Sequence, residues 1–209
     1  QTLSSDFPKR GTGNHTFGGK QDGVVMKIDP SCNTLLWTSF VGGSEDDGTF
    51  VLAINPTDGN LYVGGATQST NLPGNTAGTI QGAKSVGIDG FVTILRNDGS
   101  AFVKTTYLGT GGVDIVYGIQ FDRRGFPYVM GITRGAWPIV GNPGFINPNS
   151  GQFVAKMQPD LSAYIYSTVF GNGSMKPNIS PVAFLVDRCE NVYISGWGGN
   201  GGGRENANG

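Results

Sequence analysis

The sequence is poor in charge, in cysteine and in long apolar runs, and each shortage excludes a class of protein. Charged residues make up 14% of the 209 residues and the formal net charge is −1. The composition therefore gives no basis for binding nucleic acid or an anionic membrane. No apolar run approaches the ~20 residues that span a bilayer. Two cysteines, Cys32 and Cys189, are too few for a disulfide-stapled scaffold.

Motifs for catalysis and for cofactors are also missing. The single histidine, His15, lies in a polar stretch without a Gly-x-Ser-x-Gly elbow, and one histidine with two distant cysteines does not suggest zinc. Residues 196–201 match Gly-x-Gly-x-x-Gly, but the residues after them do not predict the helix that a dinucleotide site requires. We therefore expect no catalytic set and no cofactor.

Glycine is abundant, with 36 residues, roughly double its usual share, and several glycines belong to a repeat. The landmarks recur at steps of 62 to 67 residues and comprise a glycine and a tyrosine in each block: Gly42, Gly109, Gly171, Tyr62, Tyr128 and Tyr193. A repeat of this length is typical of stacked or radially arranged units, none of which can bury its own apolar face alone.

Each block contains four short apolar runs separated by turns. The runs at residues 61–63, 128–130 and 192–194 are aromatic and mostly β-branched, which favours strands. Asp58-Gly59-Asn60 supplies the positive φ of a tight hairpin, and no stretch has the period of a capped helix. We predict an all-β fold with about four antiparallel strands per repeat, the blade of a β-propeller.

The most consistently apolar runs, at residues 50–54, 116–121 and 182–186, are predicted to be innermost strands that are covered on both faces. The chain then divides into the end of one blade, two blades, and the start of a further blade with a flexible glycine-rich tail: residues 1–48, 49–108, 115–170 and 181–209. About three blades are fewer than the four to eight of a closed propeller, so we expect an open fragment of a larger one.

The repeat resembles a known family. The run Asp-Gly-Phe-Val from Asp89, with the Thr-Tyr-Leu-Gly, Tyr-Val and Gly-Ile-Thr that follow it, resembles the SBBP repeats of secreted Bacteroidota surface proteins. Residues 41–47 are similar to the family's Leu-Gly-Gly-Ser-Gly-Asp-Asp signature, and residues 187–199 to a variant in gliding-motility-associated, type 9-secreted adhesins. The third block departs from the pattern at residues 172–177, which lack the acids. The resemblance implies a propeller exported to the cell surface.

Two aspartates and their neighbours are candidate binding residues. Glu45, Asp46 and Asp47 form the densest acidic run, and Asp114 is the counterpart of Asp47 in the next block. Because calcium takes six to eight oxygen ligands, Asp46 and Asp47 are a weak candidate for calcium. The competing interpretation is that Asp47 and Asp114 accept hydrogen bonds from nearby backbone N–H groups.

Tryptophans are the other candidates for ligand contact. Trp37 lies within a strand, aligns with Tyr166 and is predicted to pack between blades. Trp137 and Trp197 lie at or beyond strand ends, where half-exposed aromatics serve recognition. Cys32 and Cys189 are predicted to lie several blades apart, beyond the ~7 Å between Cα atoms that a disulfide allows.

The favoured function is a non-catalytic surface module of a longer, adhesin-like polypeptide, whose partners are the rest of that polypeptide, surface glycans or other surface and secretion proteins. The long loops at residues 66–88 and 133–150 would decorate its binding face. One alternative is a polysaccharide-degrading enzyme that uses Asp46, Asp47 and Asp114. Its carboxylates would have to converge to about 5–10 Å. Another alternative is cargo or a subunit of a secretion or motility complex.

Overall fold

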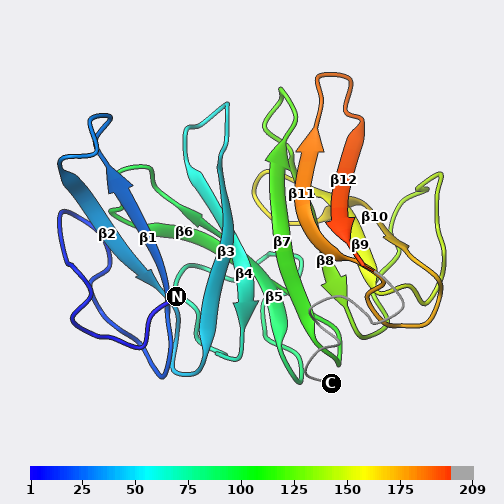
Figure 1. Ribbon diagram of the computed structural model, residues 1–209, viewed down its shortest axis with the longest axis horizontal. Helices are drawn as coiled ribbons and strands as arrows, with labels where there is room; N and C mark the ends of the chain where they lie inside the picture. Colours follow the sequence, from blue (N-terminus) through cyan, green and yellow to red (C-terminus); the bar gives the residue numbers. More distant parts are fainter. Residues whose placement is uncertain (199–209) are drawn as a thin grey trace.

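The computed structural model describes residues 1–198, and these residues form 12 β-strands and no helix. The all-β prediction is therefore confirmed, whereas the predicted flexible tail lies in residues 199–209, outside the described residues. The strands, labelled in Figure 1, are β1 (Gly23–Ile28), β2 (Leu35–Val41), β3 (Asp47–Ile54), β4 (Leu61–Thr67), β5 (Asp89–Leu95), β6 (Phe102–Leu108), β7 (Asp114–Phe121), β8 (Pro127–Thr133), β9 (Gln152–Met157), β10 (Tyr164–Phe170), β11 (Ser180–Val186) and β12 (Val192–Trp197).

The strands form four antiparallel sheets in chain order. Strands β3 to β6 make a first four-stranded sheet and β7 to β10 a second, while β1–β2 and β11–β12 are two-stranded and are called here the N-terminal and C-terminal hairpins. Figure 1 shows the four sheets in a row, with β7 between β3 and β11. Residues 1–198 do not close these sheets into a ring.

The repeat extends to an irregularity in the hydrogen-bond ladder. The register shifts between Thr49 and Val51 in β3, between Val116 and Gly118 in β7, and between Pro181 and Ala183 in β11. A bulge bends its strand and increases the local twist. Its recurrence at one place in three edge strands indicates that the three blocks share their backbone shape as well as their pattern.

Two apolar cores hold the sheets together. One lies between the N-terminal hairpin and the first sheet and includes Trp37, Val63 and Phe91. The other lies between the two four-stranded sheets and includes Val92 and Ile119. Adjacent residues of β5, Phe91 and Val92, enter different cores because successive side chains of a strand point to opposite faces. Burial on both faces explains why β5 is apolar almost throughout.

The prediction that all three innermost strands are covered on both faces is wrong for two of them. In β3, Phe50, Leu52 and Ile54 are exposed, and in β11 Val182 and Leu185 are exposed. No residue of β7 is exposed, whereas β3 and β11 each expose side chains along one face. The exposure in β3 occurs although this strand contacts both the N-terminal hairpin and the second sheet.

Candidate functional site

Asp47 and Asp114, the acids predicted as binding residues, close the loops that precede their strands. Asp47 Oδ2 accepts a hydrogen bond from the Gly43 N–H at 2.7 Å, and Asp114 Oδ2 accepts one from the Thr110 N–H at 2.6 Å. Each bond spans four residues, as does the bond from the Ser85 N–H to Asp89 Oδ2 at 2.7 Å. The interpretation that these aspartates accept backbone N–H bonds is confirmed.

Two loop-closing aspartates, Asp22 and Asp89, explain two of the glycine landmarks. A Cβ atom on Gly42 would collide with the Asp22 carboxylate, and one on Gly109 would collide with the Asp89 carboxylate. Asp22 receives the Gly18 N–H at 2.8 Å and so belongs to the same series. The glycines are needed because the backbone passes directly over the buried acid, where no side chain fits.

Burial controls the charge of these acids. It raises the pKa of Asp22, Asp47 and Asp114 above the ordinary value, and the hydrogen bonds that these carboxylates accept oppose that rise only in part. The acids next to Asp47 in the sequence are not buried with it. Asp46 is half-buried, and Glu45 forms an ion pair with Lys20 at 2.6 Å. Within residues 1–198, no group of three or more His, Cys, Asp or Glu side chains is placed to hold a metal ion.

The tryptophans differ from one another in exposure. Trp137 is only 6% exposed, stacks on Phe153 with 3.6 Å between ring centroids, and donates from Nε1 to Ser167 Oγ at 2.8 Å. The expectation that Trp137 is available to a ligand is wrong, because the loop before β9 folds back and pairs Val140 with Ser167. Trp37 is buried in the first core, as predicted. Trp197 is 50% exposed at the end of β12.

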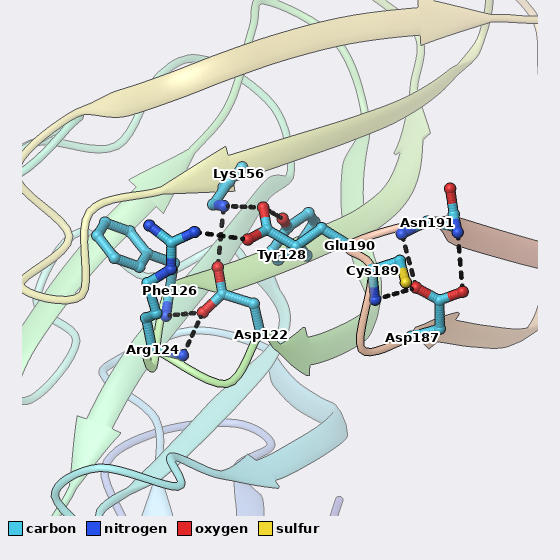
Figure 2. Close-up of polar contacts among 9 residues, drawn as sticks. All are labelled: Asp122, Arg124, Phe126, Tyr128, Lys156, Asp187, Cys189, Glu190 and Asn191. Carbon is cyan, nitrogen blue, oxygen red and sulfur yellow. Dashed lines mark hydrogen bonds and ion pairs between the residues drawn. The ribbon is translucent and has the colours of Figure 1, made fainter.

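A charged cluster that the sequence did not reveal is centred on Lys156 in β9. Its Nζ lies 2.9 Å from Asp122 Oδ2 and 2.8 Å from Glu190 Oε2, and Tyr128 donates its hydroxyl to the same Glu190 oxygen at 3.0 Å. The ammonium group also lies 5.2 Å from the centre of the Phe126 ring. Figure 2 shows the lysine between the two carboxylates, which come from different turns.

Two equivalent turns supply those carboxylates. In the β7–β8 turn, Asp122 Oδ1 accepts the Arg124 N–H at 2.8 Å. In the β11–β12 turn, Asp187 Oδ1 accepts the Cys189 N–H at 2.7 Å (Figure 2). Such Asx turns are local and recur wherever an aspartate begins a tight connection.

The position three residues after each of these aspartates differs between the two turns. It is Gly125 in the first, with φ of 82°, and Glu190 in the second, with φ of 67°. A left-handed φ favours glycine, so Glu190 carries a backbone cost of roughly 1–2 kcal/mol. Its carboxylate, directed at Lys156 and Tyr128, is the compensating interaction.

The cluster sets its own protonation states. The hydrogen bond from Lys156, followed by that from Tyr128, lowers the pKa of Glu190. Burial alone would raise the pKa of Asp122, but Lys156 and two backbone N–H groups outweigh it, so that pKa is lowered. Burial raises the pKa of Tyr128 to about 12. At neutral pH the cluster therefore holds a charged lysine between two charged carboxylates.

Two depressions lie beside this cluster. One, of about 310 Å³, is lined by Arg123, Arg124, Arg188 and Glu190. The other is an apolar groove of about 570 Å³ between the outer strands of the second sheet and β12. Its walls are mostly aliphatic and aromatic, and include Phe145, Tyr166, Phe170, Val192 and Ile194.

One sequence signal for the cluster existed. Lys156 occupies the repeat position that Ile94 holds in β5, since both lie three residues after an aligned phenylalanine. A lysine in the middle of an otherwise buried strand requires a charged partner. The identity of that partner was not readable, because Glu190 is 34 residues away in the chain.

Comparison with known proteins identifies no relative: no family model and no curated protein matches the chain. Residues 1–198 contain no helix that is long and apolar enough to cross a membrane.

Proposed function

We propose that this chain is part of a β-propeller in a secreted cell-surface protein, in which it acts as a non-catalytic binding module. The observation that carries the proposal is a four-stranded antiparallel sheet that recurs with the same strand order and the same bulge. Blades with this construction build propellers, and the resemblance to SBBP repeats supports the placement at the bacterial surface.

The uncovered sheet faces support a larger assembly made with the rest of a longer polypeptide. On the C-terminal hairpin, Leu185 lies opposite Tyr193, and Trp197 points to the same side as Tyr193 because it is four residues along β12. All three are exposed. Exposed large apolar side chains gathered on one sheet face favour an interaction site. In this proposal Trp197 packs against the next sheet rather than against a sugar.

The apolar groove supports the same arrangement. It lies where the outer strands of a further four-stranded sheet would pack against Tyr166 and Phe170 of β10. The corresponding faces of the N-terminal hairpin and of the first sheet are covered by the outer strands of the sheet that follows each of them. A role as cargo or subunit of a secretion or motility complex would use the same faces, and nothing in the contacts favours it over the surface module.

The ordered loops are the proposed binding surface. The loop before β5 is held by bonds from the Ile80 N–H to the Leu161 carbonyl at 2.9 Å and from the Tyr107 N–H to the Gln81 carbonyl at 3.0 Å. Val86 in that loop and Ile139 in the loop before β9 remain exposed. By contrast, an enzyme using Asp47 and Asp114 would need carboxylates that are already committed to closing their own loops.

Attachment of beads that display the chain to glycan-coated and cell-coated surfaces tests the function. We expect a Val86→Ser/Ile139→Ser variant to attach at most a tenth as well, since recognition energy concentrates in a few apolar contacts. The matched control is Leu3→Ser, which changes another exposed apolar residue outside both loops. Equal attachment by all three proteins would contradict the proposal, as would hydrolysis of the glycan coat by the wild type.

A further inference from the structure

Three arginines converge on one pocket of a chain that has few charges. Lysine and arginine together number 14 in 209 residues. Arg123 and Arg124 come from the β7–β8 turn and Arg188 from the β11–β12 turn, and the three line the depression of about 310 Å³. The pocket therefore lies between two sheets and depends on how they are packed together.

The turns themselves do not require arginine. The equivalent turn of the first sheet begins with Asn55, whose Oδ1 accepts the Thr57 N–H at 2.9 Å in the same Asx geometry. The residue after it is Pro56, at the position of Arg123 and Arg188. Since a proline serves that position equally well, the two arginines are not explained by the fold.

The guanidinium groups have hydrogen-bond donors to spare. Arg123 and Arg188 are exposed, and neither forms an ion pair within the described part of the chain. Arg124 makes one contact with Glu190, at 3.4 Å. The other oxygen of Glu190 is held by Lys156 and Tyr128 on the inner side of the pocket. The single acid in the lining therefore does not neutralise the three arginines.

The surrounding charges leave the mouth of the pocket positive. Four cations lie here against three carboxylates, a formal excess of one positive charge: Arg123, Arg124, Lys156 and Arg188 against Asp122, Asp187 and Glu190. Two of the acids, Asp122 and Asp187, use an oxygen to hold their own turns. What remains accessible is a set of guanidinium forks, which match the geometry of carboxylate, sulfate and phosphate groups.

We infer that this pocket is an oxyanion site that takes a sulfate or carboxylate group of an acidic saccharide chain. The choice of a saccharide rests on the proposed surface-binding function, while the choice of an oxyanion rests on the arginines alone. Glu190 contacts Arg124 at the rim at 3.4 Å, while its other oxygen is anchored by Lys156.

Calorimetric titration of the whole chain tests the site, with sodium sulfate, a sulfated oligosaccharide, an oligouronate and a neutral oligosaccharide of equal length as probes. We expect at least one acidic oligosaccharide to bind, and Arg123→Gln/Arg188→Gln to weaken it by at least about tenfold through loss of charge-assisted hydrogen bonds. Arg96→Gln, an exposed arginine on another turn, is the matched control and should bind as the wild type does. Added salt should weaken binding by screening.

The outcomes separate this inference from the proposed function. Unchanged affinity in the double variant, or no binding of either acidic oligosaccharide, overturns the site, and binding of inorganic sulfate alone overturns its assignment to a saccharide. Because both arginines are exposed, the variant should keep its thermal midpoint, which excludes misfolding as the cause. The chain could bind an acidic oligosaccharide through the arginine pocket while the Val86→Ser/Ile139→Ser variant attaches as well as the wild type. In that case the oxyanion site stands and the loop-binding function fails.

Discussion

Buried acids occur at both ends of β7, and they are stabilised in opposite ways. Asp114 begins the strand, and its Oδ2 accepts hydrogen bonds from the N–H and hydroxyl groups of Thr110 in the loop before it. Asp122 follows the last residue of the strand and is paired with Lys156 from another strand. Burial raises the pKa of Asp114, whereas the pKa of Asp122 is lowered because Lys156 and two backbone N–H groups together outweigh burial.

The comparison shows why one device recurs and the other does not. The backbone N–H bond of a loop-closing aspartate comes from the residue four positions before it, so this device can recur in any block of the repeat. The lysine cluster needs β9, the β7–β8 turn and the β11–β12 turn together (Figure 2). It therefore fixes the packing between the second sheet and the C-terminal hairpin, which is the junction where the arginine pocket lies.

Removal of the lysine should have the largest effect. Lys156→Met leaves the Asp122 carboxylate, 2% exposed, without its cation, and breaking a buried pair from one side costs about 3–5 kcal/mol. Urea unfolding measures the loss. Lys27→Met, at the equivalent position of β1 but exposed, should cost less than about 1 kcal/mol. Equal losses in the two variants would show that the cluster does not stabilise the junction.

Loss of a loop-closing acid should have the next largest effect. Asp47→Ala removes the acceptor of the Gly43 N–H and of the Ser69 hydroxyl, both of which are buried, and should cost about 2–3 kcal/mol in unfolding free energy. Asp47→Asn should cost less, because it keeps an acceptor oxygen and removes a buried charge. Asp46→Ala, the half-buried neighbour, is the control and should change stability by no more than about 0.5 kcal/mol.

The loop-closing acids and the acids of the lysine cluster should also affect stability in opposite ways as the pH falls. Asp22, Asp47 and Asp114 have raised pKa values in the folded chain, so their protonation should add stability as the pH falls from 7 toward the ordinary value of 3.8. Asp122 and Glu190 have lowered pKa values, so their contribution is complete above their ordinary values and is lost as the pH falls through the folded ones.

Urea unfolding at a series of pH values separates these two parts of the stability curve, the gain as the pH falls toward 3.8 and the loss at lower pH. Lys156→Met should reduce the loss of stability below pH 3.8, because it removes the lysine that lowers the pKa of Asp122 in the folded chain. Asp47→Asn should reduce the gain above pH 3.8. If each variant changed the gain and the loss equally, the loop-closing acids and the lysine cluster would not be electrostatically independent.

The smallest effect should come from the backbone of Glu190. Glu190→Gly and Glu190→Ala both remove the carboxylate, but only glycine relieves the left-handed φ of 67°. The glycine variant should therefore be more stable than the alanine variant by about 1 kcal/mol. Cys32, with φ of 57° at the equivalent place in the β1–β2 turn, provides a control pair whose difference should be the same. No difference at either residue would argue against the strain.

Local patterns in the sequence were sufficient for the strands, the turns and the loop-closing aspartates. Residues 61–63 belong to β4, as their pattern indicates, and Cys32 and Cys189 are both free, as their expected separation required. Exposure was harder to predict. Trp137 lies outside any strand, yet it is buried because the loop that carries it folds onto β9 and β10.

What the sequence determined by itself was everything that depends on neighbours a few residues apart: alternation along strands, positive φ in turns, and acceptors four residues from their donors. Tertiary structure alone decided which sheet faces stay open and which charges meet. Asp122 and Glu190 reach Lys156 from 34 residues away on either side in the chain. Only the packing of separate sheets sets such a contact, because no local hydrogen bond or periodicity refers to it.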